Sequence, residues 1–227
     1  MSFDSNNYWE TRYYEGGDSG AGSYGRLADF KALVLNDFVK RHRINSVNEV
    51  GCGDGNQLSL AEYPHYLGLD VSETAIKICL KKFKNDRDKQ FKLFDGILTP
   101  ESTMRMRSEL AISLDVLFHL IDDHVFSSYM KNLFALASHF VVIYSSNEFY
   151  PGETAPHVLD RCFTDWVKEH QGNWDLVEII PNIYPFDPKD PDNSSRSDFY
   201  IYKNGDKPLI KHKYFGSVWS RMLELSL

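Results

Sequence analysis

The stretch that decides the fold is "EVGCGDGNQL", residues 49–58. It overlaps the end of a strand candidate, "SVNEV" (46–50), and polar residues compatible with a helix follow it. Glycines occupy alternate positions of the turn, at Gly51, Gly53 and Gly55. A glycine lets the backbone turn tightly and lets a ligand approach it, because no Cβ intervenes. The stretch therefore predicts a ligand-binding turn at the end of a strand.

A second stretch, "GAGSYG" (20–25), has the G-x-G-x-x-G spacing of a dinucleotide-binding turn. That turn also requires a strand before it and an acidic residue about 20 positions later, at the end of a second strand. No strand pattern precedes residues 20–25, and the nearest acidic candidate, Asp37, lies within a helix pattern. Residues 49–58 meet both requirements, because Asp70 ends the next strand candidate. We interpret residues 20–25 as a glycine-rich loop.

Strand and helix candidates alternate along much of the chain. The strand candidates are 46–50, 66–70, 90–95, 110–114 and 139–144, and the helix candidates are 24–43, 72–83, 122–138 and 163–170. This alternation predicts βαβ units and a parallel sheet with helices on both faces. Two more strand candidates, 175–181 and 197–204, are joined by a proline-containing connection that excludes a helix, so an antiparallel pair is expected to end the sheet. Residues 207–227 contain a candidate closing helix.

The composition restricts the class of protein. A chain of 227 residues with 42% hydrophobic residues suits one α/β domain with a substantial core. It has no run of about 18 apolar residues and no secretory signal, so no membrane segment is expected. Three cysteines lie far apart without a C-x-x-C motif, which is typical of a reduced, cytoplasmic protein. The net charge of −7 disfavours nucleic acid as a partner and favours a small-molecule substrate.

Four motifs resemble, in order, those of the class I S-adenosylmethionine-dependent methyltransferases. They are "EVGCGDGNQL" (49–58), "YLGLDVS" (66–72), "FKLFDG" (91–96) and "LAISLDVLFHLID" (110–122). The resemblance implies an α/β, Rossmann-like, doubly wound fold with a seven-stranded, mostly parallel sheet that ends in an antiparallel β-hairpin. It also implies S-adenosylmethionine as the cofactor.

The same resemblance assigns residues to the cofactor. These residues are Glu49, Gly51, Gly53, Gly55, Asn56, Asp70, Val71, Asp95, Gly96, Leu114 and Asp115. Asp70 would accept hydrogen bonds from the ribose, Val71 would lie beside the adenine, and Asp95 would bind the adenine amino group. The fourth motif, which holds Leu114 and Asp115, would line the methionine half of the cofactor and face the substrate.

The N-terminal segment "YWETRYY" (8–14) resembles a segment that folds over the bound cofactor in many small-molecule members of the family. The resemblance makes Tyr8, Trp9 and Arg12 lid residues, and the planar guanidinium of Arg12 would suit the methionine carboxylate. A strap packed only for stability is the alternative. We therefore expect residues 1–25 to form a lid with a glycine-rich hinge, and 26–227 to form a single methyltransferase domain.

His119 is the candidate catalytic base. It follows a strand candidate at the carboxyl edge of the sheet, where open α/β sheets bind ligands, and an imidazole titrates near neutrality. It could instead contact the cofactor or orient its loop, while His124 is expected at the surface. Substrate contacts are expected from Tyr144, Asn147, His157 and Arg161, although His157 and Arg161 could equally form a capping and salt-bridging cluster.

The expected reaction is methyl transfer to a small molecule, with a hydroxyl of a sugar, glycan precursor or secondary metabolite as the acceptor. No metal is expected, because Asp115 is not followed by the Asp-Asn pair of metal-dependent relatives. An NAD(P)-dependent reductase is disfavoured, because Asn56 replaces the third glycine and no Y-x-x-x-K pair occurs. A non-catalytic binding protein of this fold is disfavoured by the acidic residues at 49, 70 and 95. The oligomeric state stays open.

Overall fold

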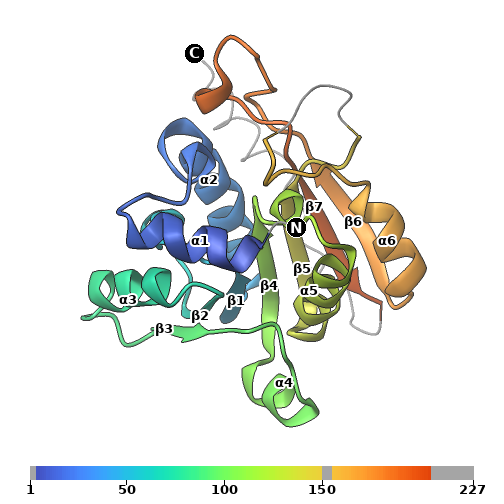
Figure 1. The fold of residues 1–227 in the computed structure, drawn as a ribbon. Coiled ribbons are helices and arrows are strands. Elements are labelled where there is room, and N and C mark those ends of the chain that lie inside the picture. Colours follow the sequence, from blue (N-terminus) through green and yellow to red (C-terminus); the bar gives the residue numbers. More distant parts are fainter. Residues whose placement is uncertain (1–3, 150–154, 206–227) are drawn as a thin grey trace.

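A computed structural model describes residues 4–149 and 155–205 (Figure 1). The helices are α1 (Ser5–Tyr14), α2 (Gly25–His42), α3 (Glu73–Lys82), α4 (Pro100–Met106), α5 (Asp123–Ala135) and α6 (Phe163–His170). The strands are β1 (Ser46–Val50), β2 (His65–Asp70), β3 (Lys89–Leu93), β4 (Ser108–Leu114), β5 (Ala137–Ser145), β6 (Trp174–Ile180) and β7 (Asp198–Asn204). The closing helix expected within 207–227 lies outside the described residues.

The described strands form one seven-stranded sheet in the order β3-β2-β1-β4-β5-β7-β6 (Figure 1). Strands β1 to β5 pair in parallel, and β7 runs antiparallel to both β5 and β6. The predicted Rossmann-like, doubly wound sheet with a terminal antiparallel hairpin is therefore confirmed. Because the strand order reverses direction at β1 and β4, a ligand is expected at the carboxyl ends of these two strands.

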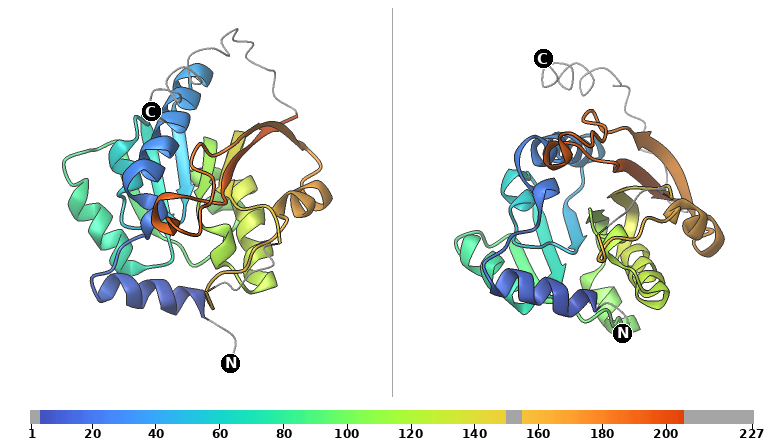
Figure 2. Two further views of the ribbon diagram at one scale, coloured as in Figure 1. Left: turned by 90° about the horizontal axis from the view of Figure 1, so that it is seen from above. Right: turned by 45° about the horizontal axis from the view of Figure 1, so that its top comes forward.

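Helices cover both faces of the sheet (Figure 2). On one face, α2 and α3 pack on the strands, and Phe38 of α2 belongs to the same buried cluster as Ile112 of β4. On the other face, Met130 of α5 and Phe163 of α6 are buried with Val141 of β5. Among the described helices, none has both the length and the apolar character that crossing a membrane requires.

Two helices were not predicted from the sequence, α1 and α4. The first buries only Tyr13, so it lacks an apolar stripe, but Asp4 caps its start by accepting a hydrogen bond from the backbone N–H of Asn7 at 3.1 Å. The second has seven residues and buries none of them. It begins with a capping box at Thr99 and with Pro100 in the first turn. Both helices depend on local capping, which hydrophobic periodicity does not reveal.

Strand β1 carries a buried carboxylate at Glu49. The hydroxyl of Tyr66, on the neighbouring strand β2, donates to Glu49 Oε2 at 2.5 Å. Burial raises the pKa of Glu49 from 4.5 to about 7, although the bond from Tyr66 and the charge of Lys31 act in the opposite direction. The folded protein therefore keeps a proton that the unfolded chain releases at lower pH. The contribution of Glu49 makes the fold less stable as the pH rises through the window from 4.5 to about 7.

We predict that Glu49→Gln, which keeps an acceptor for Tyr66 but carries no charge, removes this loss of stability. The free energy of unfolding of the variant minus that of the wild type should increase by up to about 3 kcal/mol across that window. Urea unfolding at several pH values measures the difference. Glu62→Gln, at an exposed position, is the control and should show no such trend. A difference that does not change with pH would contradict the assignment to Glu49.

Candidate cofactor-binding and active site

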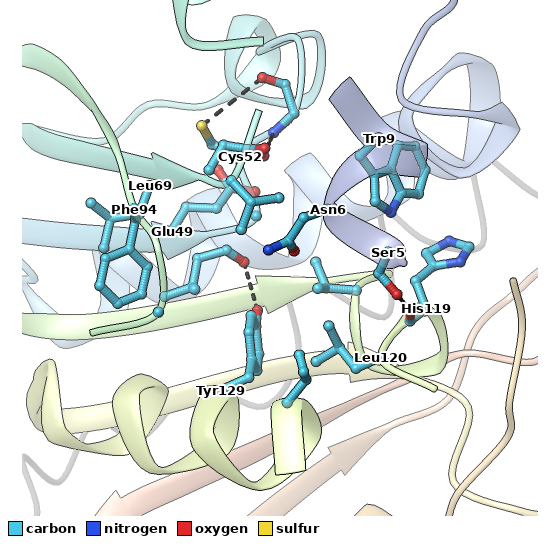
Figure 3. A pocket seen from close by; sticks show the side chains of 18 of the residues that line it. Ser5, Asn6, Trp9, Glu49, Cys52, Leu69, Phe94, His119, Leu120 and Tyr129 are labelled. Atoms are coloured by element: carbon cyan, nitrogen blue, oxygen red, sulfur yellow. Dashed lines mark hydrogen bonds between the residues drawn. The ribbon is translucent and has the colours of Figure 1, made fainter. Parts of the chain in front are cut away.

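A cavity of about 420 Å³ lies at the carboxyl ends of β1, β2 and β4, within the range of small-molecule sites (Figure 3). The strands contribute their last residues, Val50, Asp70 and Leu114, and α1 contributes Ser5 and Trp9 among others. The predicted cofactor and catalytic residues that line the cavity are Trp9, Glu49, Gly51, Gly53, Asp70, Val71, Asp95, Gly96, Leu114, Asp115 and His119. The structure thus brings together residues from all four motifs.

The glycine turn packs closely against neighbouring segments of the chain. Gly53 has φ 56°, and a Cβ at this position would lie 2.3 Å from Ser19 Oγ, so only glycine lets the two segments meet. Gly55 packs against α3 and Asn56 donates from its side chain to the backbone of residues 20–25. Neither Gly55 nor Asn56 lines the cavity, and their assignment to the cofactor stays a prediction.

Asp70 connects strand β2 to the glycine turn. Its Oδ2 accepts a hydrogen bond from the backbone N–H of Gly53 at 2.8 Å, and its Oδ1 accepts one from Ser72 N–H at 2.9 Å. Burial raises the pKa of Asp70, while these two backbone bonds act in the opposite direction. Since a carboxylate offers about four acceptor positions, the group can still accept hydrogen bonds from a ligand.

The end of the cavity near Asp70 includes apolar side chains. Val71 and Phe94 line it together with Asp95 and Gly96, the residues that follow β2 and β3. Asn132 of α5 donates from its side chain to the carbonyl of Gly96 at 2.7 Å, which holds the loop after β3 against α5. Apolar surface next to a single carboxylate suits a planar heteroaromatic ring with an amino group.

Helix α5 supplies part of the wall that the sequence motifs did not indicate. The hydroxyl of Tyr129 donates to the carbonyl of Val50 at 2.7 Å and lies 2.7 Å from Ser113 Oγ, which fixes α5 to β1 and β4. His124, predicted at the surface, is exposed and also lines the cavity. Lining residues without a predicted role include Ser5, Asn6, Tyr13, Ser19, Phe94, Tyr129 and Asn132. For the residues of α5, the sequence signal that could have indicated a role is the occurrence of polar positions within the helix candidate 122–138.

Helix α1 is attached to the body of the protein at two points. Glu10 accepts hydrogen bonds at 2.6 Å from the hydroxyls of Ser72 and Thr74, and at 3.2 Å from Thr74 N–H. These bonds, that of Ser72 first, lower the pKa of Glu10. At the start of the helix, Ser5 Oγ donates to the carbonyl of His119 at 2.8 Å. The helix is therefore bound both to the N-terminus of α3 and to the loop after β4.

The three predicted lid residues have different surroundings. Trp9 lines the cavity, whereas Tyr8 stacks on His157 with 4.8 Å between ring centroids and does not line it. Arg12 donates from Nε to the carbonyl of Asp18 at 2.6 Å and forms an ion pair with its carboxylate at 3.0 Å. Because Arg12 does not line the cavity, its predicted contact with a methionine carboxylate stays a prediction.

The segment after α1 is held against the glycine turn. Ser19 N–H and the hydroxyl of Tyr24 both donate to Asp54 Oδ2, at 3.1 and 2.8 Å. In return, Asp54 N–H donates to Ser19 Oγ at 3.0 Å. The stretch 20–25 therefore lies beside the glycine turn of residues 51–55, and it is preceded by α1 rather than by a strand.

His119 lies beside Trp9 at the edge of the cavity (Figure 3). Its Nδ1 is 3.0 Å from the carbonyl oxygen of His157, and since a carbonyl can only accept, Nδ1 carries the hydrogen. The other ring nitrogen, Nε2, therefore holds a free electron pair in the neutral ring. Burial lowers the pKa of His119 from 6.5 to about 4, so the ring is neutral at pH 7. The geometry therefore leaves one ring nitrogen as a hydrogen-bond acceptor.

The residues predicted to contact the acceptor are buried in the protein or bonded within it. Tyr144 is buried in the core, and Asn147 exchanges hydrogen bonds with Thr164 at the start of α6. Arg161 pairs with Asp123 at 2.5 Å and donates to two carbonyls of the loop after β4. None of these residues, nor His157, lines the cavity, and their contact with a substrate stays a prediction.

Comparison with solved structures shows the fold. The N-methyltransferase NodS of Bradyrhizobium japonicum WM9, in complex with S-adenosyl-L-homocysteine, matches with a TM-score of 0.65 and 13% identity over 89% of this chain and 100% of its own. Magnesium protoporphyrin IX methyltransferase (ChlM) of Synechocystis PCC 6803 matches with a TM-score of 0.62 and 15% identity over 88% and 97%. The CurJ carbon methyltransferase matches with a TM-score of 0.56 and 12% identity over 77% and 54%.

Comparison of sequences gives a more limited result. No protein-family profile matches the chain. A highly reducing polyketide synthase of Pyrenophora dematioidea is 32% identical in an alignment of 119 residues that covers 48% of this chain and 4% of the synthase. The structural matches and the strand order together establish that the described part of the chain has the fold of the class I S-adenosylmethionine-dependent methyltransferases.

Proposed function

We propose that the protein is an S-adenosylmethionine-dependent methyltransferase that acts on a hydroxyl group of a small molecule. The observation that carries this proposal is the position of Asp70. Its carboxylate ends β2, accepts the N–H of Gly53 in the glycine turn, and lines the cavity. A carboxylate in that position can accept hydrogen bonds from the vicinal hydroxyls of a ribose.

The other residues of the cavity fit the same cofactor. Val71 and Phe94 offer apolar surface for a purine ring, and Asp95 offers an acceptor for its amino group. When bound there, S-adenosylmethionine supplies an electrophilic methyl group on a positively charged sulfur. The glycine turn does not fit a dinucleotide equally well, because Asn56 stands where such a turn has its third glycine and bonds back to residues 20–25.

The protein's own contribution would be to position the reactants and to accept a proton. Holding the nucleophile in line with the methyl group supplies much of the rate in such a reaction. We assign the proton to Nε2 of His119, because Nδ1–H is committed to the His157 carbonyl. Trp9 and the rest of α1 would exclude water, and we propose residues 1–25 as the lid and 26–227 as the methyltransferase domain. The free cysteines Cys52, Cys79 and Cys162 support a reducing, cytoplasmic location.

A carbon acceptor is a second candidate. The CurJ protein is a carbon methyltransferase, and the matching sequence belongs to a polyketide synthase. A neutral imidazole can remove a proton from an acidic carbon as well as from a hydroxyl. Incubation with labelled S-adenosylmethionine and either class of compound, followed by NMR of the product, distinguishes an O-methyl from a C-methyl group.

Calorimetric titration tests the cofactor. We expect heat of binding with S-adenosylmethionine and none with NAD, and the reverse result would overturn the proposal. Asp70→Ala should weaken S-adenosylmethionine binding by about 1.5–3 kcal/mol, because charge-assisted hydrogen bonds are lost. Asp88→Ala, at an exposed position next to β3, is the control and should bind like the wild type. Unchanged affinity in Asp70→Ala would mean that the cofactor motif is assigned to the wrong residues.

His119→Ala tests the base. Turnover should fall by about 10²-fold or more, the usual contribution of a general base, while affinity for S-adenosylmethionine stays within about twofold of the wild type. Since the base must be deprotonated, wild-type turnover should stay level at neutral pH and fall only as the pH approaches about 4. Transfer of a tritium-labelled methyl group measures both effects, with the exposed residue His65 replaced by alanine as the control. Loss of cofactor affinity with unchanged turnover at saturation would make His119 a binding residue instead.

A further inference from the structure

One of the carboxylate residues at the cavity, Asp115, has an unusual backbone conformation. It directly follows β4, and its φ of 58° lies in the left-handed region, which a residue with a Cβ rarely adopts. Its backbone N–H donates to the carbonyl of Tyr144 at 2.9 Å, and its carboxylate lines the cavity. Such conformations persist only where the surroundings hold them, and they concentrate at functional sites.

Two distant elements hold this carboxylate. Lys31 of α2 places Nζ 2.7 Å from Asp115 Oδ2, and Ser197, just before β7, donates its hydroxyl to Asp115 Oδ1 at 3.0 Å. The Lys31 side chain is fully buried, whereas that of Asp115 is 16% exposed. The cation is thus enclosed in protein, and the anion is the member of the pair that reaches the cavity.

A buried ion pair such as Lys31–Asp115 is only weak evidence of a role in stability. Removing two charges from water costs free energy that their attraction often only offsets, and well-packed apolar residues commonly stabilise a core as much or more. The protein nevertheless combines a fully buried ammonium with a carboxylate in a strained conformation. Gly22 also leaves room for this carboxylate, because a Cβ at Gly22 would lie 2.8 Å from Asp115 Oδ2.

The charged side chains that line the cavity distinguish Asp115 from the other carboxylates. The lining contains carboxylates and, among the described residues, no lysine or arginine side chain. The carboxylate residues are Glu49, Asp54, Asp70, Asp95 and Asp115. Burial keeps Glu49 protonated up to a pH near neutrality, and Asp54 and Asp70 accept backbone hydrogen bonds. Asp115 differs from these three residues, because its carboxylate forms an ion pair with a fully buried ammonium.

We propose that Lys31 holds the carboxylate of Asp115 against the cavity, and that this carboxylate makes the site prefer the cationic S-adenosylmethionine to the neutral S-adenosylhomocysteine. Asp115 is the group that interacts with the ligand's charge, and Lys31 is a positioning residue. Favouring the charged donor over the uncharged product would assist product release after each methyl transfer. The inference rests on the proposed function, since it requires S-adenosylmethionine as the ligand.

Calorimetric titration of four proteins with both ligands tests the proposal. The wild type should bind S-adenosylmethionine more tightly than S-adenosylhomocysteine. Asp115→Asn should reduce this preference by about tenfold, because it removes the anion and leaves the ammonium of Lys31 unpaired. The double variant Lys31→Met with Asp115→Asn removes both charges, so it should regain thermal stability but should still prefer S-adenosylmethionine less than the wild type does. Asp115→Asn alone should be the least stable of the four, below Lys31→Met alone, because the fully buried ammonium of Lys31 is left without its partner.

The outcomes separate this proposal from the proposed function. If the double variant regains both stability and the wild-type preference, the pair is structural and the proposal is wrong. An unchanged preference in Asp115→Asn would overturn it as well, while binding of S-adenosylmethionine by the wild type would leave the proposed function standing. If the wild type binds neither ligand, the proposed function itself fails. The matched control is the partly buried ion pair Asp86–Lys89, at 2.5 Å, which does not line the cavity; its replacement by asparagine and methionine should leave the preference unchanged.

Discussion

The hydrogen bond from Gly53 N–H to the Asp70 carboxylate is the interaction on which the site depends. It joins the turn after β1 to the end of β2, so two neighbouring parallel strands present their last residues to one cavity. Because Asp70 also accepts the N–H of Ser72, the same carboxylate fixes the start of α3. A single buried group thus sets the relative positions of a glycine turn, a strand end and a helix start.

Further hydrogen bonds connect helix α1 and the segment after it to the residues around this contact. Ser72 not only donates its N–H to Asp70 but also gives its hydroxyl to Glu10 of α1. Ser19, in the segment after α1, exchanges hydrogen bonds with Asp54 of the glycine turn. The N-terminal helix is therefore connected to the residues around the cavity by polar contacts rather than by a large apolar face, which agrees with its single buried residue.

The sheet and most helices could be predicted because each has a periodic apolar pattern, and the glycine turn could be located because strand, turn and acid follow in order. The N-terminal helix could not, since its stability comes from capping and tertiary polar contacts. Lys31 gave no signal either, because it lies within an apolar helix pattern and its partner is 84 positions away. Asn147 and Arg161 were predicted at strand and helix ends near the site, but position along the chain does not reveal that their side chains bond to Thr164 and Asp123.

The attachment of α1 to Ser72 and Thr74 has a thermodynamic consequence. These residues immediately follow the strand end that carries Asp70, so a ligand that orders this strand end also orders the surface to which Glu10 binds. Linkage between two binding events is reciprocal. If the docked helix raises the affinity for the ligand by a given factor, the bound ligand raises the equilibrium constant for docking of the helix by the same factor. Under the proposed function, the N-terminal segment would therefore act as a second, intramolecular ligand of the same site, and its detachment would accompany exchange of the bound molecule.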